Sequence, residues 1–290
     1  MITPWEFGLG CINRIIVFFT HKNFHLRVRA FAKRMSKKYL ADGYYAFKEA
    51  RLPLLDADTD TLFWGCVFED IFLIYLAHDS CYDEKQMAPY YDDILPEGPY
   101  ELRNDSIDVT LKEGDVLLDA GSWIGDFAAY ASAKGALTYA FEPDNSNYEY
   151  LLKTAILNKD IYPVKKGLSN LKTKIAFKHD EDSSSGSHVN LEINPDVEEH
   201  AIEIEITTID AFVQENNLKR VDFIKADIEG YERYMLEGAK ETLKKFSPKL
   251  AICTYHLKDD PEVLSKIIKE ANPAYEIVQK KKKLYAAVPK

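Results

Sequence analysis

The stretch VLLDAGSWIG at residues 116–125 decides the fold expected for this chain. An apolar run ending in Asp119, followed by Gly121 and Gly125, is the pattern of a buried parallel strand, a tight glycine turn and a helix N-terminus. A second apolar run, YAFE at residues 139–142, ends in Glu142. A carboxylate there can accept two hydrogen bonds from the 2′ and 3′ hydroxyls of a ribose. The two runs therefore indicate a nucleoside-cofactor site.

The glycine spacing narrows the cofactor. Dinucleotide sites use G-x-G-x-x-G, because the pyrophosphate must approach the backbone at a helix N-terminus. Here the pattern is D-x-G-x-x-x-G. A strand-end carboxylate and one fewer glycine suit a cofactor without phosphates, and S-adenosylmethionine is such a cofactor. The residues expected to bind it are Asp119, Gly121, Ser122, Trp123, Gly125, Glu142 and Asp227.

From Val109 onward, apolar strand patterns alternate with helical ones, which indicates an α/β fold with a doubly wound, Rossmann-like parallel sheet. Strands are expected at residues 116–119, 137–141, 161–165, 223–226, 250–254, 275–279 and 284–288. Two further strands, at 174–178 and 202–207, flank the loop-like insertion DEDSSSG at 180–186. The run Lys280 to Lys283 lies between two strand patterns and is expected to be a solvated hairpin turn.

Residues 1–105 are expected to form a mainly helical, acceptor-selecting region, and residues 106–290 the catalytic domain. Helices are expected near 44–49 and 62–77, and Pro89, Pro96 and Pro99 mark the boundary. Apolar residues from Phe24 to Tyr39 recur at helical spacing among basic ones, so this segment is expected to be a basic amphipathic helix.

The formal net charge of −10 argues against a duplex nucleic-acid binder. Residues 1–40 contain eight Lys or Arg and one acid, Glu6, so this segment carries +7 and the rest −17. The helix at 22–38, from Lys22 to Lys38, either packs on its own domain or contacts an anionic surface. No apolar run approaches the ~20 residues that span a bilayer. The expected location is cytoplasmic, with possible peripheral contact at the inner membrane surface.

A second cluster of charges lies at VDFIKADIEGYE, residues 221–232. An apolar strand ends in Asp227, with Lys225, Glu229 and Glu232 close by. The carboxyl ends of parallel strands share one edge of the sheet, so this cluster should face the first motif. An isolated D-x-E-G is more often a capped helix with solvated acids, but the two motifs together favour a functional site.

At these residues the chain resembles the FkbM family of S-adenosylmethionine-dependent methyltransferases. The family patterns D-x-G-A-x-x-G and I-K-x-D-x-E-G-x-E are matched at 119–125 and 224–232, and the similarity extends over roughly 106–288. It includes the T-x-D segment at Thr208 and the pair Tyr255-His256. Ser122-Trp123 departs from the family, and Trp123 is expected to narrow the methionine end of the pocket. The resemblance implies a class I methyltransferase sheet and O-methylation, often of a sugar or polyketide hydroxyl.

Methyl transfer to a hydroxyl requires a positioned nucleophile and removal of its proton. The expected catalytic residues are Lys225, Asp227, Glu229 and His256, and the last three can take the proton. A lone His is often structural. His188, in the insertion, either descends from a lid or belongs to a surface loop. The four cysteines show no metal spacing or C-x-x-C pair, so free thiols and no metal site are expected.

The function expected is O-methylation of a sugar, polysaccharide or glycoconjugate hydroxyl, with S-adenosylmethionine as cofactor. Two alternatives remain open at this point. One is a nicotinamide-dependent oxidoreductase on a similar sheet, although G-x-G-x-x-G is missing. The other is a non-catalytic protein that binds S-adenosylmethionine and interacts with a partner. The oligomeric state is left open.

Overall fold

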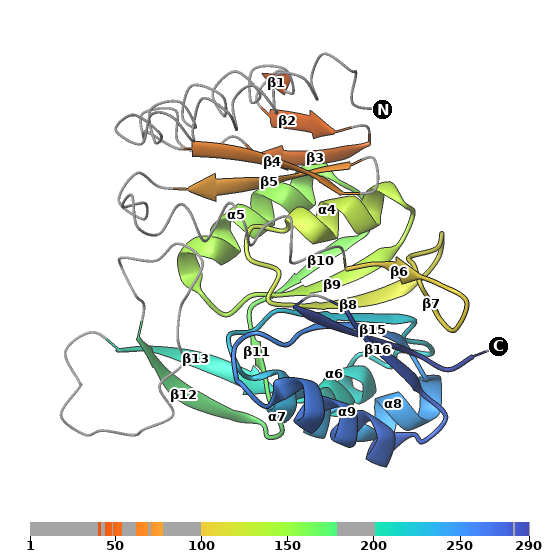
Figure 1. Cartoon of the computed structure of the whole chain (residues 1–290). Coiled ribbons are helices and arrows are strands. Elements are labelled where there is room, and N and C mark those ends of the chain that lie inside the picture. The colour runs from red at the N-terminus through yellow and green to blue at the C-terminus, as the bar shows by residue number, and fades with distance from the viewer. Residues whose placement is uncertain are drawn as a thin grey trace, which may run out of the picture.

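The computed structural model describes residues 40–41, 44–47, 49–53, 62–68, 71–77, 100–178, 201–280 and 282–289. At its centre lies a seven-stranded sheet in the order β10-β9-β8-β14-β15-β17-β16 (Figure 1). Strands β10, β9, β8, β14 and β15 pair in parallel, and β17 is antiparallel to both neighbours. The expected Rossmann-like α/β fold is confirmed. The strands are β8 Val116–Ala120, β9 Leu137–Phe141, β10 Ile161–Val164, β14 Phe223–Ala226, β15 Lys249–Cys253, β16 Glu276–Lys280 and β17 Lys283–Ala287.

Helices cover both faces of this sheet, which explains why its central strands are almost continuously apolar. Figure 1 shows α4 and α5 on one face and the remaining helices on the other. In α9, Leu264, Ile267 and Ile268 are buried on one side of the helix, the spacing of an amphipathic surface helix. The helices are α4 Asp126–Ala133, α5 Asn145–Leu157, α6 Ile209–Glu215, α7 Glu232–Glu237, α8 Lys240–Phe246 and α9 Asp260–Ala271.

A smaller three-stranded sheet contains β11 (Gly167–Leu168), β13 (Ala201–Thr207) and β12 (Thr173–Lys178), in that order. β12 and β13 pair antiparallel along their length. This confirms the two additional strands expected around the insertion. The insertion itself, with His188, lies outside the described residues.

The helices expected near 44–49 and 62–77 are wrong. The chain instead forms β1 (Leu40–Ala41), β2 (Tyr44–Phe47) and β3 (Ala50–Pro53) in one sheet, and β4 (Leu62–Phe68) and β5 (Ile71–Ala77) in another. The sequence LFWGCVF…IFLIYLA is dense in aromatic and β-branched residues, which favour strands. Antiparallel pairing of β4 with β5 along their full length then supplies hydrogen-bond partners for the facing backbone groups of both segments.

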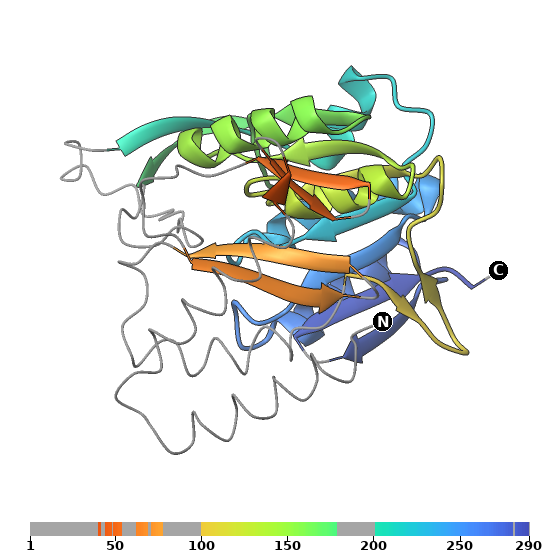
Figure 2. The ribbon, with the colours of Figure 1, turned by 90° about the horizontal axis from the view of Figure 1, so that it is seen from above.

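Strand β3 is attached to the central sheet through α5. The Asn158 side chain accepts a hydrogen bond from the Arg51 backbone N–H (3.0 Å) and donates one to the Arg51 carbonyl (2.7 Å). Asn158 lies at the C-terminal end of α5. Figure 2 shows β1–β3 lying across the α4 and α5 layer, and β3 contacts both helices. The N-terminal strands therefore add a layer over this face.

The hairpin of β6 (Leu102–Arg103) and β7 (Asp108–Val109) spans the expected boundary between residues 105 and 106. Tyr100 and Leu102 pack in the same buried cluster as Leu117 and Phe127. The division into 1–105 and 106–290 stays a prediction, and the segment from Tyr100 packs with the later part. Among the described helices, none combines the length and the apolar run needed to cross a bilayer. The basic segment at 22–38 lies outside the described residues.

Candidate active site

The candidate site lies where the strand order reverses, between β8 and β14. From this pair the sheet extends through β9 and β10 on one side and through β15 on the other. Ligands of such sheets bind beyond the carboxyl ends of the strands at this point. Asp119 pairs with Lys225 in the register of the two strands. The Asp227 backbone N–H then donates to the Ala120 carbonyl (3.1 Å), so the two strand ends stay together. The two sequence motifs therefore meet, as expected.

The turn after β8 requires glycine. Gly121 has φ +72°, and a Cβ there would lie 1.9 Å from the Asp227 carbonyl oxygen. Gly125 has φ +86°, and a Cβ there would lie 2.7 Å from a Leu151 methyl group on α5. The first glycine lets the turn approach the second motif, and the second lets α4 approach α5. Trp123, between them, also has positive φ (+49°), which is unusual for a bulky residue.

Glu142 is fixed beside this turn. One carboxylate oxygen accepts from the Trp123 backbone N–H and the other from the Asp144 backbone N–H, both at 2.9 Å. Burial raises the pKa of Glu142 to about 8, although both backbone donors lower it. A carboxylate offers about four acceptor positions, so two remain for hydroxyl donors. This arrangement suits a ribose diol.

Lys225 and Asp119 form a buried ion pair below the turn. The Lys225 ammonium lies 3.1 Å from Asp119 Oδ1 and donates to the Gly121 carbonyl (2.5 Å). Burial opposes the charge, but Asp119, Asp227 and Asp126 raise the pKa of Lys225 above its ordinary value. Its ammonium therefore stays charged and holds the glycine turn. This placement makes Lys225 an orienting group.

The acids of this edge also fit the cofactor electrostatically. Both carboxylate oxygens of Asp119 are buried and accept no hydrogen bond from the described residues. Burial raises the pKa of Asp126, in the first turn of α4, to about 6. Together with Glu142, these groups give the edge acceptors for the ammonium and hydroxyl groups of a cofactor that carries a sulfonium cation. The residues present thus fit S-adenosylmethionine.

Asp227 is the centre of the second half of the site. One of its oxygens accepts from the Tyr100 hydroxyl (2.8 Å), and the other accepts from the Tyr255 hydroxyl (3.0 Å). Burial would raise the pKa of Asp227, but Lys225, His256 and Lys283 together with the Tyr100 hydrogen bond lower it. Asp227 is therefore an ionised carboxylate with both oxygens engaged.

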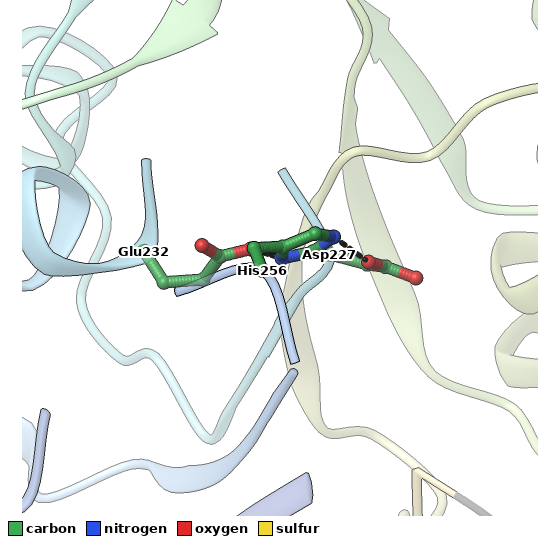
Figure 3. A group of neighbouring side chains, drawn as sticks. All are labelled: Asp227, Glu232 and His256. Atoms are coloured by element: carbon green, nitrogen blue, oxygen red, sulfur yellow. Dashed lines mark ion pairs between the residues drawn. The ribbon is translucent and has the colours of Figure 1, made fainter. Parts of the chain in front are cut away.

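His256 lies between three carboxylates, as Figure 3 shows for Asp227 and Glu232. Its Nε2 is 3.5 Å from Asp227 Oδ1 and 3.4 Å from Glu229 Oε2, and its Nδ1 is 3.0 Å from Glu232 Oε1. The contact between Nδ1 and Glu232 is the shortest of the three and is within hydrogen-bonding distance, whereas the two contacts of Nε2 are longer ion pairs. Burial lowers the pKa of His256, but the three carboxylates, Glu232 foremost, raise it to about 9.

Asp227, Glu232 and His256 form the one group among the described residues with ligand atoms close enough for a metal ion, within 4.8 Å of one another. The two ring nitrogens of His256 face different carboxylates. A single ion bound by all three residues would have to break one of these contacts. The geometry therefore favours an ion-paired imidazole over a metal site.

The structure adds residues for which no role was expected. Tyr100 lies between two buried lysines, with its ring centroid 5.2 Å from the Lys225 ammonium and 4.3 Å from that of Lys283. Lys283 was expected in a solvated turn, but it is buried in β17, which corrects that expectation. Within the run Lys280 to Lys283, the local sequence does not show that Lys283 is the buried lysine. Glu232 lies in the same motif as Asp227, and its spacing from Asp227 is the sequence feature that could have indicated its place in the site.

Known proteins similar to this chain are methyltransferases. Residues 116–275 match a family model described as the Methyltransferase FkbM domain. Over 173 residues the chain is 29% identical to the hexuronic acid methyltransferase AglP of Haloferax volcanii, an alignment that covers 58% of this chain and 67% of that protein.

Solved structures that match this chain include an FkbM methyltransferase from Methylobacillus flagellatus KT, with 23% identity and a TM-score of 0.45. The match covers 61% of this chain but 44% of that one, so the chain spans less than half the length of that relative. Fibrillarin from Aeropyrum pernix with natively bound S-adenosyl-L-methionine is 12% identical, with a TM-score of 0.40 and coverage of 85% of this chain and 94% of that one.

Proposed function

Because the chain belongs to the FkbM methyltransferase family, we propose that it transfers a methyl group to a hydroxyl of a sugar, polysaccharide or glycoconjugate. The chain is an S-adenosylmethionine-dependent methyltransferase, and the oxygen acceptor is the part proposed here. Family membership overturns the nicotinamide-dependent alternative, which the missing G-x-G-x-x-G already opposed.

The cofactor-binding half is the turn from Asp119 to Gly125 together with Glu142. In this proposal Glu142 accepts the ribose hydroxyls and Asp119 accepts from the amino-acid end, while the Gly121 and Ser122 backbone shapes the turn. In this proposal Trp123 narrows the methionine end of the pocket, as the sequence predicts. When bound, the sulfonium cofactor supplies an electrophilic methyl carbon. Asp227, next to Gly121, orients both halves of the site.

The observation that carries the proposal for a hydroxyl acceptor is the position of His256 Nε2. This nitrogen faces Asp227 and Glu229 at the sheet edge next to the glycine turn. A hydroxyl must lose its proton as its oxygen forms the new bond, and an imidazole at this edge can take it. Lys225 already donates to the carbonyl of Gly121, and Asp227 already accepts from two tyrosine hydroxyls. We therefore assign proton removal to His256, with Glu229 beside it.

The sugar class rests on AglP, whose name describes a hexuronic acid methyltransferase. A uronic acid offers two kinds of oxygen acceptor, its hydroxyls and its carboxylate. Transfer to the carboxylate forms an ester and requires no base, whereas transfer to the hydroxyl forms an ether and does. The proposal here is the ether.

The test supplies the full chain with S-adenosylmethionine carrying a labelled methyl group, and with free and nucleotide-linked hexuronic acids beside matched neutral hexoses. Labelled product that survives mild alkali supports ether formation, whereas label released by alkali indicates an ester and contradicts the hydroxyl acceptor. No product with any of these sugars would contradict a free or nucleotide-linked monosaccharide as the acceptor.

Two substitutions then test the assignment of residues. His256→Ala should lower kcat by about 10²-fold or more, the usual contribution of a positioned base, with a smaller change in cofactor affinity. Asp227→Asn should also lower kcat more than cofactor affinity, because it removes the charge beside His256 Nε2 and weakens the hydrogen bonds from Tyr100 and Tyr255. Wild-type rates in both variants would show that neither residue serves the transfer. A loss confined to cofactor affinity in Asp227→Asn would assign Asp227 to binding alone.

A further inference from the structure

The Glu232 side chain is held in one orientation. It is fully buried at the start of α7. One oxygen accepts from the Ile228 backbone N–H (2.8 Å), and the other accepts from the Gly230 backbone N–H (3.0 Å). Glu229 and Gly230 have φ values of +54° and +95°, which curl the loop so that both N–H groups point at this side chain. The loop and the carboxylate therefore fix each other.

The same carboxylate meets one side of the His256 ring. Glu232 Oε1, which accepts from Ile228, lies 3.0 Å from His256 Nδ1. The opposite nitrogen faces Asp227 and Glu229. The Tyr255 ring lies 4.1 Å from the imidazole, centroid to centroid, and the His256 side chain is 8% exposed. Glu232 therefore occupies the Nδ1 side, and Nε2 lies against Asp227 and Glu229 at the edge where the two motifs meet.

We propose that Glu232 is the positioning residue of the transfer, holding the proton on Nδ1 of His256 so that Nε2 receives the proton of the acceptor hydroxyl. This inference rests on the proposed function. The hydroxyl oxygen forms a bond to the methyl carbon while the carbon–sulfur bond breaks and its electron pair stays on sulfur. The hydroxyl proton moves to Nε2 and later leaves to solvent. A buried carboxylate that orients a histidine in this way fixes its tautomer and stabilises the imidazolium that forms.

The surroundings of His256 predict how the rate depends on pH. Facing the ring are Glu232 from α7, Asp227 and Glu229 from the loop after β14, and Tyr255 from the loop after β15. Beyond Asp227 lie the cations Lys225 and Lys283. With its pKa raised to about 9, His256 is protonated at neutral pH and must lose a proton to act as a base. We expect kcat/KM to rise with pH up to about 9.

The experiment compares wild type with Glu232→Gln and with Glu237→Gln as the matched control. Glu237 is exposed at the other end of α7, so its substitution removes the same charge from the same helix. Glu232→Gln should lower the apparent pKa of the kcat/KM profile by about one unit or more, since it removes an adjacent opposite charge. Its kcat should fall about tenfold or more, with S-adenosylhomocysteine affinity within about twofold of wild type. Glu237→Gln should leave all three unchanged.

A second measurement is independent of any acceptor. Titration of His256 by NMR in the folded protein should give a pKa near 9 in wild type, a lower value in Glu232→Gln and a retained elevation in Glu232→Asp. An unshifted rate profile or an unshifted His256 titration in Glu232→Gln would overturn the proposal. If Glu232→Gln does not fold, an ordinary pKa for wild-type His256 would overturn it. Absence of hydroxyl methylation by wild type would instead reject the proposed function, with the titration still testing the Glu232–His256 contact.

Discussion

At the scale of single residues, Glu142 couples cofactor binding to pH. Its two oxygens accept from the Trp123 and Asp144 backbones, and its pKa is raised to about 8 by burial. The ionised form has acceptor positions for two hydroxyls, whereas protonation converts one oxygen into a donor. Because the folded pKa lies near neutrality, the protonated form is populated under ordinary conditions.

We therefore expect S-adenosylhomocysteine affinity to weaken as the pH falls from about 9 to 6.5, measured by calorimetry. Glu142→Ala should weaken binding by about 1.5–3 kcal/mol, which is about tenfold or more. Glu142→Gln, which cannot titrate, should show little pH dependence over the same range. Equal affinity in folded Glu142→Ala and wild type would remove Glu142 from the cofactor site.

At the scale of elements, the contact between the ends of β8 and β14 depends on the missing side chain of Gly121. Gly121→Ala would place a methyl group 1.9 Å from the Asp227 carbonyl at a φ of +72°. The strand ends must separate, and we expect a loss of about 3 kcal/mol or more in the free energy of unfolding.

Gly114→Ala is the control, since Gly114 also has positive φ (+78°) but has nothing within 4 Å of an added Cβ. Gly114→Ala should lower the free energy of unfolding by only about 1 kcal/mol, because it introduces backbone strain without a steric clash. Urea unfolding of both variants measures the difference. Equal losses in the two variants would mean that the close approach of the turn to Asp227 adds nothing.

The attachment of β3 to α5 makes a second prediction at this scale. Asn158→Ala removes both hydrogen bonds to the Arg51 backbone. We expect faster amide hydrogen exchange at Arg51 and a loss of about 0.5–1.5 kcal/mol, since water can replace these exposed bonds. Asn145→Ala, at the exposed opposite end of the same helix, is the control. Unchanged exchange at Arg51 would show that other contacts hold β3.

At the scale of the whole molecule, the charge is divided unevenly. Residues 1–40 carry +7 and the remainder −17. We propose that the basic segment at 22–38 brings the enzyme to an anionic surface such as a membrane bearing lipid-linked glycan. Each basic residue near such a surface contributes about 1 kcal/mol, so four of them suffice for measurable binding.

Cosedimentation with anionic and neutral vesicles at low salt tests this proposal. We expect binding to anionic vesicles alone, lost when Arg27, Arg29, Lys33 and Arg34 are changed to Gln. The control changes four exposed lysines elsewhere to Gln, namely Lys219, Lys240, Lys244 and Lys266. No sedimentation of wild type, or equal loss in both variants, would contradict a specific role for this segment.

The sequence by itself determined the central sheet and the meeting of its two motifs. Strands buried on both faces leave continuous apolar runs, and parallel strands bring their carboxyl ends to one edge, so Asp119, Glu142 and Asp227 could be placed from spacing alone. The family resemblance added His256 by its place after the fifth strand. These signals are local, or they follow from the rules of a parallel sheet.

Only the tertiary structure decided which groups surround the residues of the candidate site. Tyr100 and Lys283 lie far apart in the sequence and meet beside Asp227, and nothing near either residue in sequence indicates the other. Residues 62–77 form the strands β4 and β5 instead of the expected helix, because short apolar runs have no decisive period and pairing with a partner strand selects between the two forms. Such contacts depend on residues far apart in the chain, which local patterns do not encode.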